Sequence, residues 1–260
     1  MRPAKGPGAW WLALIIVGVF LYIPIVVLMV MSFSDSDSPF NWGGFSFRWY
    51  AELFGNTTLM SAALTSLFIG VGAMLIATPL GTLLAIGLTR YSRSRAMEGL
   101  AMAPALAPEL LLGLGLLSLY SMLEIPKSAT TILLAHAAFG IAFVVAIVRA
   151  RLAGSDPALE EAARDLGATE FGALWRVTLP LLGPTVAASA LLVFTLSLDE
   201  FVIAFFTAGP TTATLPIVIY SQIRNGVSPE VNALATILVL VSVIAVVIGA
   251  RVFRRSETRT

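Results

Sequence analysis

Long apolar stretches alternate with short polar segments along the whole chain. The apolar stretches cover residues 10–32, 60–88, 97–120, 129–149, 183–206 and 232–253. A helix needs about 20 apolar residues to cross the hydrocarbon layer of a bilayer, and each stretch is long enough. The pattern predicts an all-α polytopic membrane protein with six transmembrane helices, organised as a single transmembrane domain over residues 1–260.

Two features refine this prediction. The first stretch is too long for the apolar core of a secretory signal and is not followed by a small-residue cleavage site, so we expect a retained membrane helix. The third stretch contains Pro104, Pro108, Gly113 and Gly115, which favour a kink. Composition agrees with a lipid environment, because 58% of the residues are hydrophobic and only 12% are charged.

Basic residues indicate how the helices are oriented. Thirteen of the 16 lysines and arginines lie in the two terminal segments and in the segments after the second and fourth stretches. The opposite set of segments holds only Arg48, Lys127 and Arg224. Because Lys and Arg accumulate on the cytoplasmic side of membrane proteins, we expect both termini and the loop over residues 155–180 to be cytoplasmic.

Several kinds of chemistry are excluded by the residues present. The chain has no cysteine and one histidine, His136, so thiolate metal sites and multi-histidine clusters are excluded, and we expect no metal site. Neither Lys5 nor Lys127 follows glycine, so the chain lacks the phosphate-binding loop of nucleotide hydrolases. His136 lies in the fourth stretch and is expected to make a hydrogen bond between packed helices.

The 155–180 loop carries strong helix signals. Asp156 and Pro157 are typical of a helix start, and Gly167 of a left-handed helix end. Thr169 is expected to cap a second short helix, which Leu179-Pro180 should stop. These signals predict a pair of short helices at the membrane surface.

The same loop resembles a family motif. The sequence Glu161-Ala162-Ala163, then Gly167, Val177 and Leu179-Pro180, is similar to the EAA loop of binding-protein-dependent ABC importer permeases, with Val177 where the family usually has Ile. The resemblance implies the type I ABC importer permease fold. It also implies that Glu161, Ala162, Ala163, Gly167, Leu179 and Pro180 form the loop that couples the permease to an ATPase.

Acidic residues inside the apolar stretches are the candidate substrate pathway. Glu109 lies in the third stretch, and Asp199 and Glu200 in the fifth. A carboxylate at mid-membrane costs up to about 3 kcal/mol on insertion scales. No basic residue lies well inside a stretch, so a cationic substrate is one candidate partner. The alternative is pairing with a second permease subunit or with polar backbone at a helix break.

Two further observations bear on this pathway. Asp199 and Glu200 would point about 100° apart on one helix, and we favour Asp199 as the residue facing the pathway. Phe201 follows directly, and Phe205 and Phe206 come soon after. These rings are candidates for stacking against the methylene or ammonium groups of a substrate.

A wider resemblance concerns the cargo. The segments 196–204, 209–210 and 226–236, together with Leu21 to Pro24 and Arg48 to Tyr50, are similar to the permeases of spermidine/putrescine importers. Those relatives commonly carry Asp where this chain has Glu109 and Glu200. The resemblance implies a bacterial inner-membrane permease that moves polyamines inward by ATP-driven alternating access.

The resemblance also implies partners. A second permease subunit, giving a heterodimer, two ATPase subunits and an extracytoplasmic solute-binding protein are expected, whereas nucleic acid is not. No cofactor is expected on this chain, since ATP and Mg would bind to the ATPases. Two alternatives stay open: the same machinery for another amine or amino-acid-derived solute such as an opine, and an ion-coupled secondary transporter.

Overall fold

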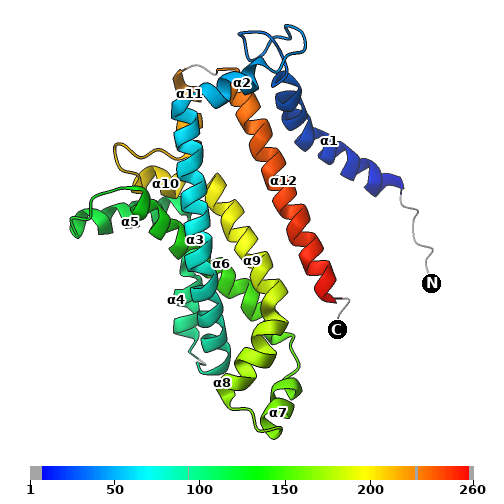
Figure 1. Ribbon diagram of the computed structural model, residues 1–260, viewed down its shortest axis with the longest axis vertical. Coiled ribbons are helices and arrows are strands. Elements are labelled where there is room, and N and C mark those ends of the chain that lie inside the picture. The colour runs from blue at the N-terminus through cyan, green and yellow to red at the C-terminus, as the bar shows by residue number, and fades with distance from the viewer. Residues whose placement is uncertain (1–7, 93, 226–227, 258–260) are drawn as a thin grey trace. The chain divides into compact units, whose positions relative to one another are not determined.

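The computed structural model is helical apart from connecting segments, and it describes residues 8–92, 94–225 and 228–257 (Figure 1). The helices are α1 (Gly8–Met31), α2 (Arg48–Gly55), α3 (Thr57–Arg90), α4 (Arg95–Leu106), α5 (Glu109–Met122), α6 (Ala129–Ala153), α7 (Ala158–Asp165), α8 (Glu170–Ala173), a π-helical turn η1 (Leu174–Thr178), α9 (Leu179–Asp199), α10 (Val202–Thr207), α11 (Leu215–Asn225) and α12 (Glu230–Glu257). An isolated bridge joins Ser34 and Phe45.

The chain forms two compact units, one of residues 1–60 and 221–241 and the other of residues 61–220 and 242–260. In the first unit, the apolar window of α1 has no buried residue. Aromatic rings of the 33–50 segment pack together, and Ser32 Oγ lies 2.8 Å from Tyr50 Oη. Asn56 Nδ2 donates to Glu230 Oε2 at 2.8 Å, which joins the start of α3 to the start of α12.

The core of the second unit lies between α3, α6 and α9. Its buried apolar side chains are Ala77, Ala85, Ile86, Val144, Val148, Leu152, Leu182 and Val193. Glycines bring the helices close together: a Cβ on Gly81 of α3 would lie 2.6 Å from Val144 Cβ, and one on Gly140 of α6 would lie 2.7 Å from Val193 Cγ1. Small residues at such crossings are typical of helix packing in membranes.

The third expected span, 97–120, is not one straight helix. It is divided into α4 and α5, which are bent by 104°. The break falls at Ala107 and Pro108, and Ala107 is extended with ψ of 141°. A residue before proline is pushed away from helical geometry, whereas Pro104 stays inside α4. The expected kink is confirmed in this region, but it is a complete break.

The fifth expected span, 183–206, has different bounds. The helical path begins at Glu170 and runs through α8 and η1 into α9, which ends at Asp199. The expectation that Leu179-Pro180 stops a separate helix is therefore wrong: Pro180 lies in the first turn of α9. Proline has no N–H to donate to the preceding turn, and the π-helical turn lies just before it.

By length and composition, the described residues contain four helices that can cross a membrane, or five if α4 and α5 count as one bent span. The four lie at Trp10–Met31, Thr57–Arg90, Ala129–Ala153 and Glu170–Asp199. The sixth expected span falls in α12, of which Glu230–Ile244 is a shorter apolar helix. Six spans therefore remain a prediction.

Replacing Gly81 with Ala is expected to destabilise the protein by about 1–3 kcal/mol. The new methyl group would meet Val144 Cβ at 2.6 Å and the Ile141 carbonyl oxygen at 3.0 Å. Gly87→Ala is the matched control, because an added Cβ there has nothing within 4 Å, and it should be neutral or gain up to about 1 kcal/mol. Thermal unfolding in detergent compares the two, and equal melting temperatures would contradict the close α3–α6 contact.

Candidate functional site

The 155–180 loop is built around α7, which starts at Ala158, one residue later than expected, with Pro157 at the N-cap position. At the start, the Ala158 N–H donates to Asp156 Oδ1 at 3.0 Å. At the end, Gly167 has a φ of +89°. The Ala168 N–H then donates to the Ala163 carbonyl at 3.0 Å, and the Gly167 N–H to Arg164 at 2.8 Å. This hydrogen-bond pair is a Schellman motif, which favours glycine at the left-handed position.

The second half of the loop leads into a long helix. Thr169 caps α8, since its Oγ1 accepts from the Gly172 N–H at 3.1 Å. The cap is confirmed, although the helix continues through η1 instead of ending. Leu179 and Pro180 begin α9, with Leu179 half-buried and Pro180 exposed.

Adjacent acids of α7 have different surroundings. Glu161 and Ala162 are exposed and Ala163 is half-buried, so this face is available to a partner. The carboxylate of Glu160 instead accepts hydrogen bonds from Arg90 Nη2 at the end of α3 and from Thr178 Oγ1 in η1. Sequence reasoning missed Glu160, Arg90 and Thr178 as a group, because they are far apart along the chain.

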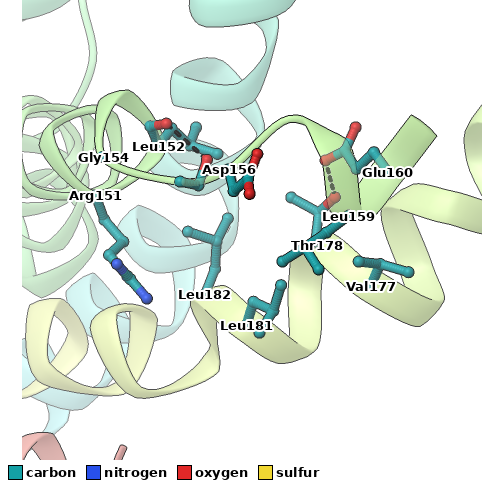
Figure 2. Close-up of a pocket in the computed structure, with 11 residues that line it drawn as sticks. Arg151, Leu152, Gly154, Asp156, Leu159, Glu160, Val177, Thr178, Leu181 and Leu182 are labelled. Atoms are coloured by element: carbon teal, nitrogen blue, oxygen red, sulfur yellow. Dashed lines mark hydrogen bonds between the residues drawn. The ribbon is translucent and has the colours of Figure 1, made fainter. Parts of the chain in front are cut away.

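A cavity of about 120 Å³ lies beside this group (Figure 2). Leu159 and Glu160 of α7 face it from one side, and Val177, Thr178 and Leu181 from the other. Figure 2 shows the hydrogen bond between Glu160 and Thr178 at its rim. Helix α7 is therefore joined to α3 and η1 by the hydrogen bonds of Glu160, which lie next to this cavity.

The three acids of the apolar stretches lie at helix breaks. Glu109 is the first residue of α5, Asp199 is the last of α9, and Glu200 follows in extended geometry. The expectation that Asp199 and Glu200 share one helix is therefore wrong. Glu200 is 7% exposed, and its Oε1 accepts from the Ile203 N–H at 2.9 Å, which caps α10.

Glu109 begins α5 and Glu200 lies just before α10, and these two helices pack together, with Phe206 lying over Gly113. Asp199 is exposed. Within the described residues, none of the three acids has a basic partner. Glu109 and Glu200 thus lie at the starts of two packed helices, α5 and α10, whereas Asp199 is the last residue of α9.

Aromatic rings surround the second break. Phe201 lies 5.5 Å from Phe205 and 4.8 Å from Tyr220 between ring centroids, and Phe205 lies 5.6 Å from Phe206. Tyr220 is a member of this group that sequence reasoning missed, since it lies on α11. Carboxylates beside aromatic faces suit an organic cation with apolar methylene groups.

The single histidine has a structural position. His136 Nδ1 lies 2.7 Å from Ser197 Oγ, and this buried hydrogen bond joins α6 to α9. The expected role in helix packing is confirmed. In the described ranges, no group of three or more His, Asp or Glu residues is placed to hold a metal ion.

Comparison with known proteins identifies what the chain is similar to. Residues 77–260 match the family of binding-protein-dependent transport system inner membrane components. The chain is 42% identical over 243 residues to the spermidine/putrescine transport system permease protein PotC of Escherichia coli strain K12, covering 92% of this chain and 91% of the relative. It is 41% identical over 239 residues to the putrescine transport system permease protein PotI of that strain, covering 88% and 85%.

A solved structure shares the fold. It belongs to a bacterial ABC transporter involved in the import of the acidic polysaccharide alginate. The TM-score is 0.71 and the sequence identity 21%, with 97% of this chain and 95% of the other covered. At this identity the similarity concerns the fold alone.

Replacing Gly167 with Ala is expected to loosen the end of α7. A side chain at a φ of +89° costs about 1–2 kcal/mol, so cleavage within residues 155–180 should be faster in limited proteolysis of the detergent-solubilised protein. Gly154→Ala is the matched control, since its φ is −97° and an added Cβ has only Arg151 O nearby, at 3.8 Å. Equal cleavage of the two variants would contradict the Schellman end.

Proposed function

The chain belongs to the family of binding-protein-dependent transport system inner membrane components, and we propose that it is the permease subunit of an ABC importer for polyamines of the spermidine and putrescine class. As a family member it is a multi-pass, non-catalytic membrane subunit. The observation that carries the cargo proposal is its similarity, over nearly the whole chain, to two polyamine permeases.

The fold by itself does not select a cargo, because the alginate transporter has the same fold and carries a polyanion. The charges at the helix breaks are therefore informative. Glu109, Asp199 and Glu200 have no basic partner in the described part of the chain. A polyamine would supply the missing cations, and Phe201 and Phe205 would contact its methylene groups.

The proposed topology has six membrane spans in the type I arrangement, with α4 and α5 forming one broken span. Both termini and the 155–180 loop would face the cytoplasm. The distribution of basic residues supports this orientation. On this assignment, Arg90 and Arg149 lie near the cytoplasmic ends of their helices. Glu109 and Glu200 lie at helix breaks deeper in the membrane.

The proposed assembly contains a second, different permease subunit, two ATPases that bind ATP and Mg, and an extracytoplasmic binding protein. The exposed Glu161 and Ala162, with Ala163, would meet the ATPase. Gly167 would shape the end of α7, and Leu179 and Pro180 would begin the helix that leads to Asp199. ATP-driven closure of the ATPases would then alternate access to the acids between the two sides.

A second candidate cargo is another amine or an amino-acid-derived solute, carried by the same machinery. It is favoured by Glu109 and Glu200, which are one methylene longer than the Asp that the resemblance to polyamine permeases leads us to expect there. An ion-coupled secondary transporter is not favoured, because it has no ATPase subunit that would bind the exposed Glu161 and Ala162 of α7.

The complex, reconstituted in proteoliposomes with its binding protein, is expected to accumulate labelled spermidine or putrescine only when ATP is present on the ATPase side. The binding protein alone should retain the same amines in a ligand screen. If the binding protein retains a different amine, the second candidate cargo is favoured over polyamines. Uptake by this chain alone without ATP would refute the ABC assignment.

Glu109→Gln and Glu200→Gln are expected to insert normally but to lower polyamine uptake at least about tenfold, because a hydrogen bond to a charged group contributes about 1.5–3 kcal/mol. Gln keeps the acceptor that Glu200 offers to Ile203, so the fold at the break should persist. Glu124→Gln is the matched control, since Glu124 is exposed beyond the opposite end of α5. Unchanged uptake kinetics in both test variants would exclude the acids from the pathway.

A further inference from the structure

The coupling helix α7 is held to the rest of its unit with little apolar packing. It contains no buried residue. One cavity of about 120 Å³ and another of about 350 Å³ border it, and Glu160 lines both. Apolar burial therefore does not fix the position of α7 against the long helices.

Polar contacts of Glu160 supply the missing connection. Its Oε1 accepts from Arg90 Nη2, the last residue of α3, and from Thr178 Oγ1, the last residue of η1. Arg90 Nη2 also donates to Thr178 Oγ1 at 2.9 Å. Three elements from distant parts of the sequence therefore meet at one carboxylate, which we call the Glu160 junction (Glu160, Arg90 and Thr178).

The junction is better shielded than the other contacts of the loop. The Arg90 and Glu160 side chains are each 20% exposed, and Thr178 is buried. The other ion pair of α7, Arg164 with Glu170 at 3.8 Å, stays within the loop, and its side chains are 47% and 66% exposed. Among the ion pairs of residues 8–92, 94–225 and 228–257, only Arg90–Glu160 joins α7 to α3, whereas Arg164–Glu170 joins it to the first residue of the helical path that leads into α9.

Hydrogen bonds between ionised groups are roughly twice as strong as neutral ones, and partial burial limits their screening by salt. A displacement of α7 is therefore resisted mainly by the polar contacts of the Glu160 junction, because the neighbouring cavities provide no packing contacts. The neighbouring Glu161 is exposed. Of these two adjacent acids, Glu160 makes the contacts with α3 and η1, and Glu161 is left accessible to the proposed partner.

We propose that Glu160 is a positioning residue that makes α7 move as one body with the ends of α3 and α9, so that a displacement of α7 by the ATPase reaches the membrane helices. The inference rests on the proposed coupling of this chain to an ATPase. It does not depend on which solute is carried.

A distance measurement on the assembled complex tests this. The chain has no cysteine, so Tyr91→Cys just after α3 and Asp165→Cys at the end of α7 place two spin labels, with the partner subunits made cysteine-free. With Glu160 present, the distance between labels should be narrowly distributed and the same in nucleotide-free and ATP-trapped complexes. With Glu160→Gln, it should broaden and change with nucleotide.

Matched variants distinguish the effect of losing a hydrogen bond of the junction from the effect of changing the size of a side chain. Thr178→Ser keeps the hydroxyl and should behave as the unsubstituted chain, whereas Thr178→Val removes it and should broaden the distribution. The exchange Arg90→Glu with Glu160→Arg should restore a narrow distribution that either change alone loses. If Glu160→Gln fails to assemble, the two Thr178 variants decide the question.

A second readout is solute taken up per ATP hydrolysed. It should fall at least about fivefold in Glu160→Gln, while the ATPase still co-purifies and the thermal stability of the complex is retained. Unchanged distances together with an unchanged ratio would overturn the inference and leave the proposed importer intact. Absence of polyamine uptake by the unsubstituted complex would refute only the cargo. A chain that binds no ATPase would overturn both proposals.

Discussion

Backbone hydrogen bonding inside lipid is the constraint on which this structure depends. Hydrocarbon offers no hydrogen-bond partner, so an interrupted helix must satisfy its freed N–H and C=O groups within the protein. At the second break Glu200 does this for the Ile203 N–H, and at the first the Ala107 N–H still reaches Ala103. Breaks therefore require side chains or backbone groups that complete these hydrogen bonds. Glu109 and Glu200 lie at two such breaks, where negative charge is the basis of the proposed cation pathway.

Hydropathy and helix-end signals predicted much of the fold. The expected spans 10–32, 60–88 and 129–149 correspond to α1, α3 and α6 within a few residues, and both ends of α7 follow from Asp156 and Gly167. The predictions were wrong where a helix is interrupted, as between α4 and α5, or continues past an expected end, as from α8 into α9. A hydropathy window measures apolar content and does not register that Pro104 is accommodated inside α4 while Pro108 ends it. The π-helical turn before Pro180 was missed for the same reason.

The site was predictable only in part. Glu161 and the three acids were found because a motif and an intramembrane charge are local signals, although the roles of these residues remain proposals. The contacts of Glu160 were missed, since nothing nearby in the sequence indicates which helices this residue reaches. Its partners Arg90 and Thr178 are 70 and 18 residues away. Such contacts exist only once α3, α7 and η1 have packed.

The close crossing of α6 and α9 has a geometric consequence. Gly140 has no side chain, and a Cβ there would lie only 2.7 Å from Val193 Cγ1. From Val193, α9 extends about 21 Å back to Leu179 and about 9 Å forward to Asp199, at 1.5 Å per residue. If α9 turned as a rigid body about this crossing, its Leu179 end would travel more than twice as far as its Asp199 end. A large displacement at the loop would then become a small one at Asp199.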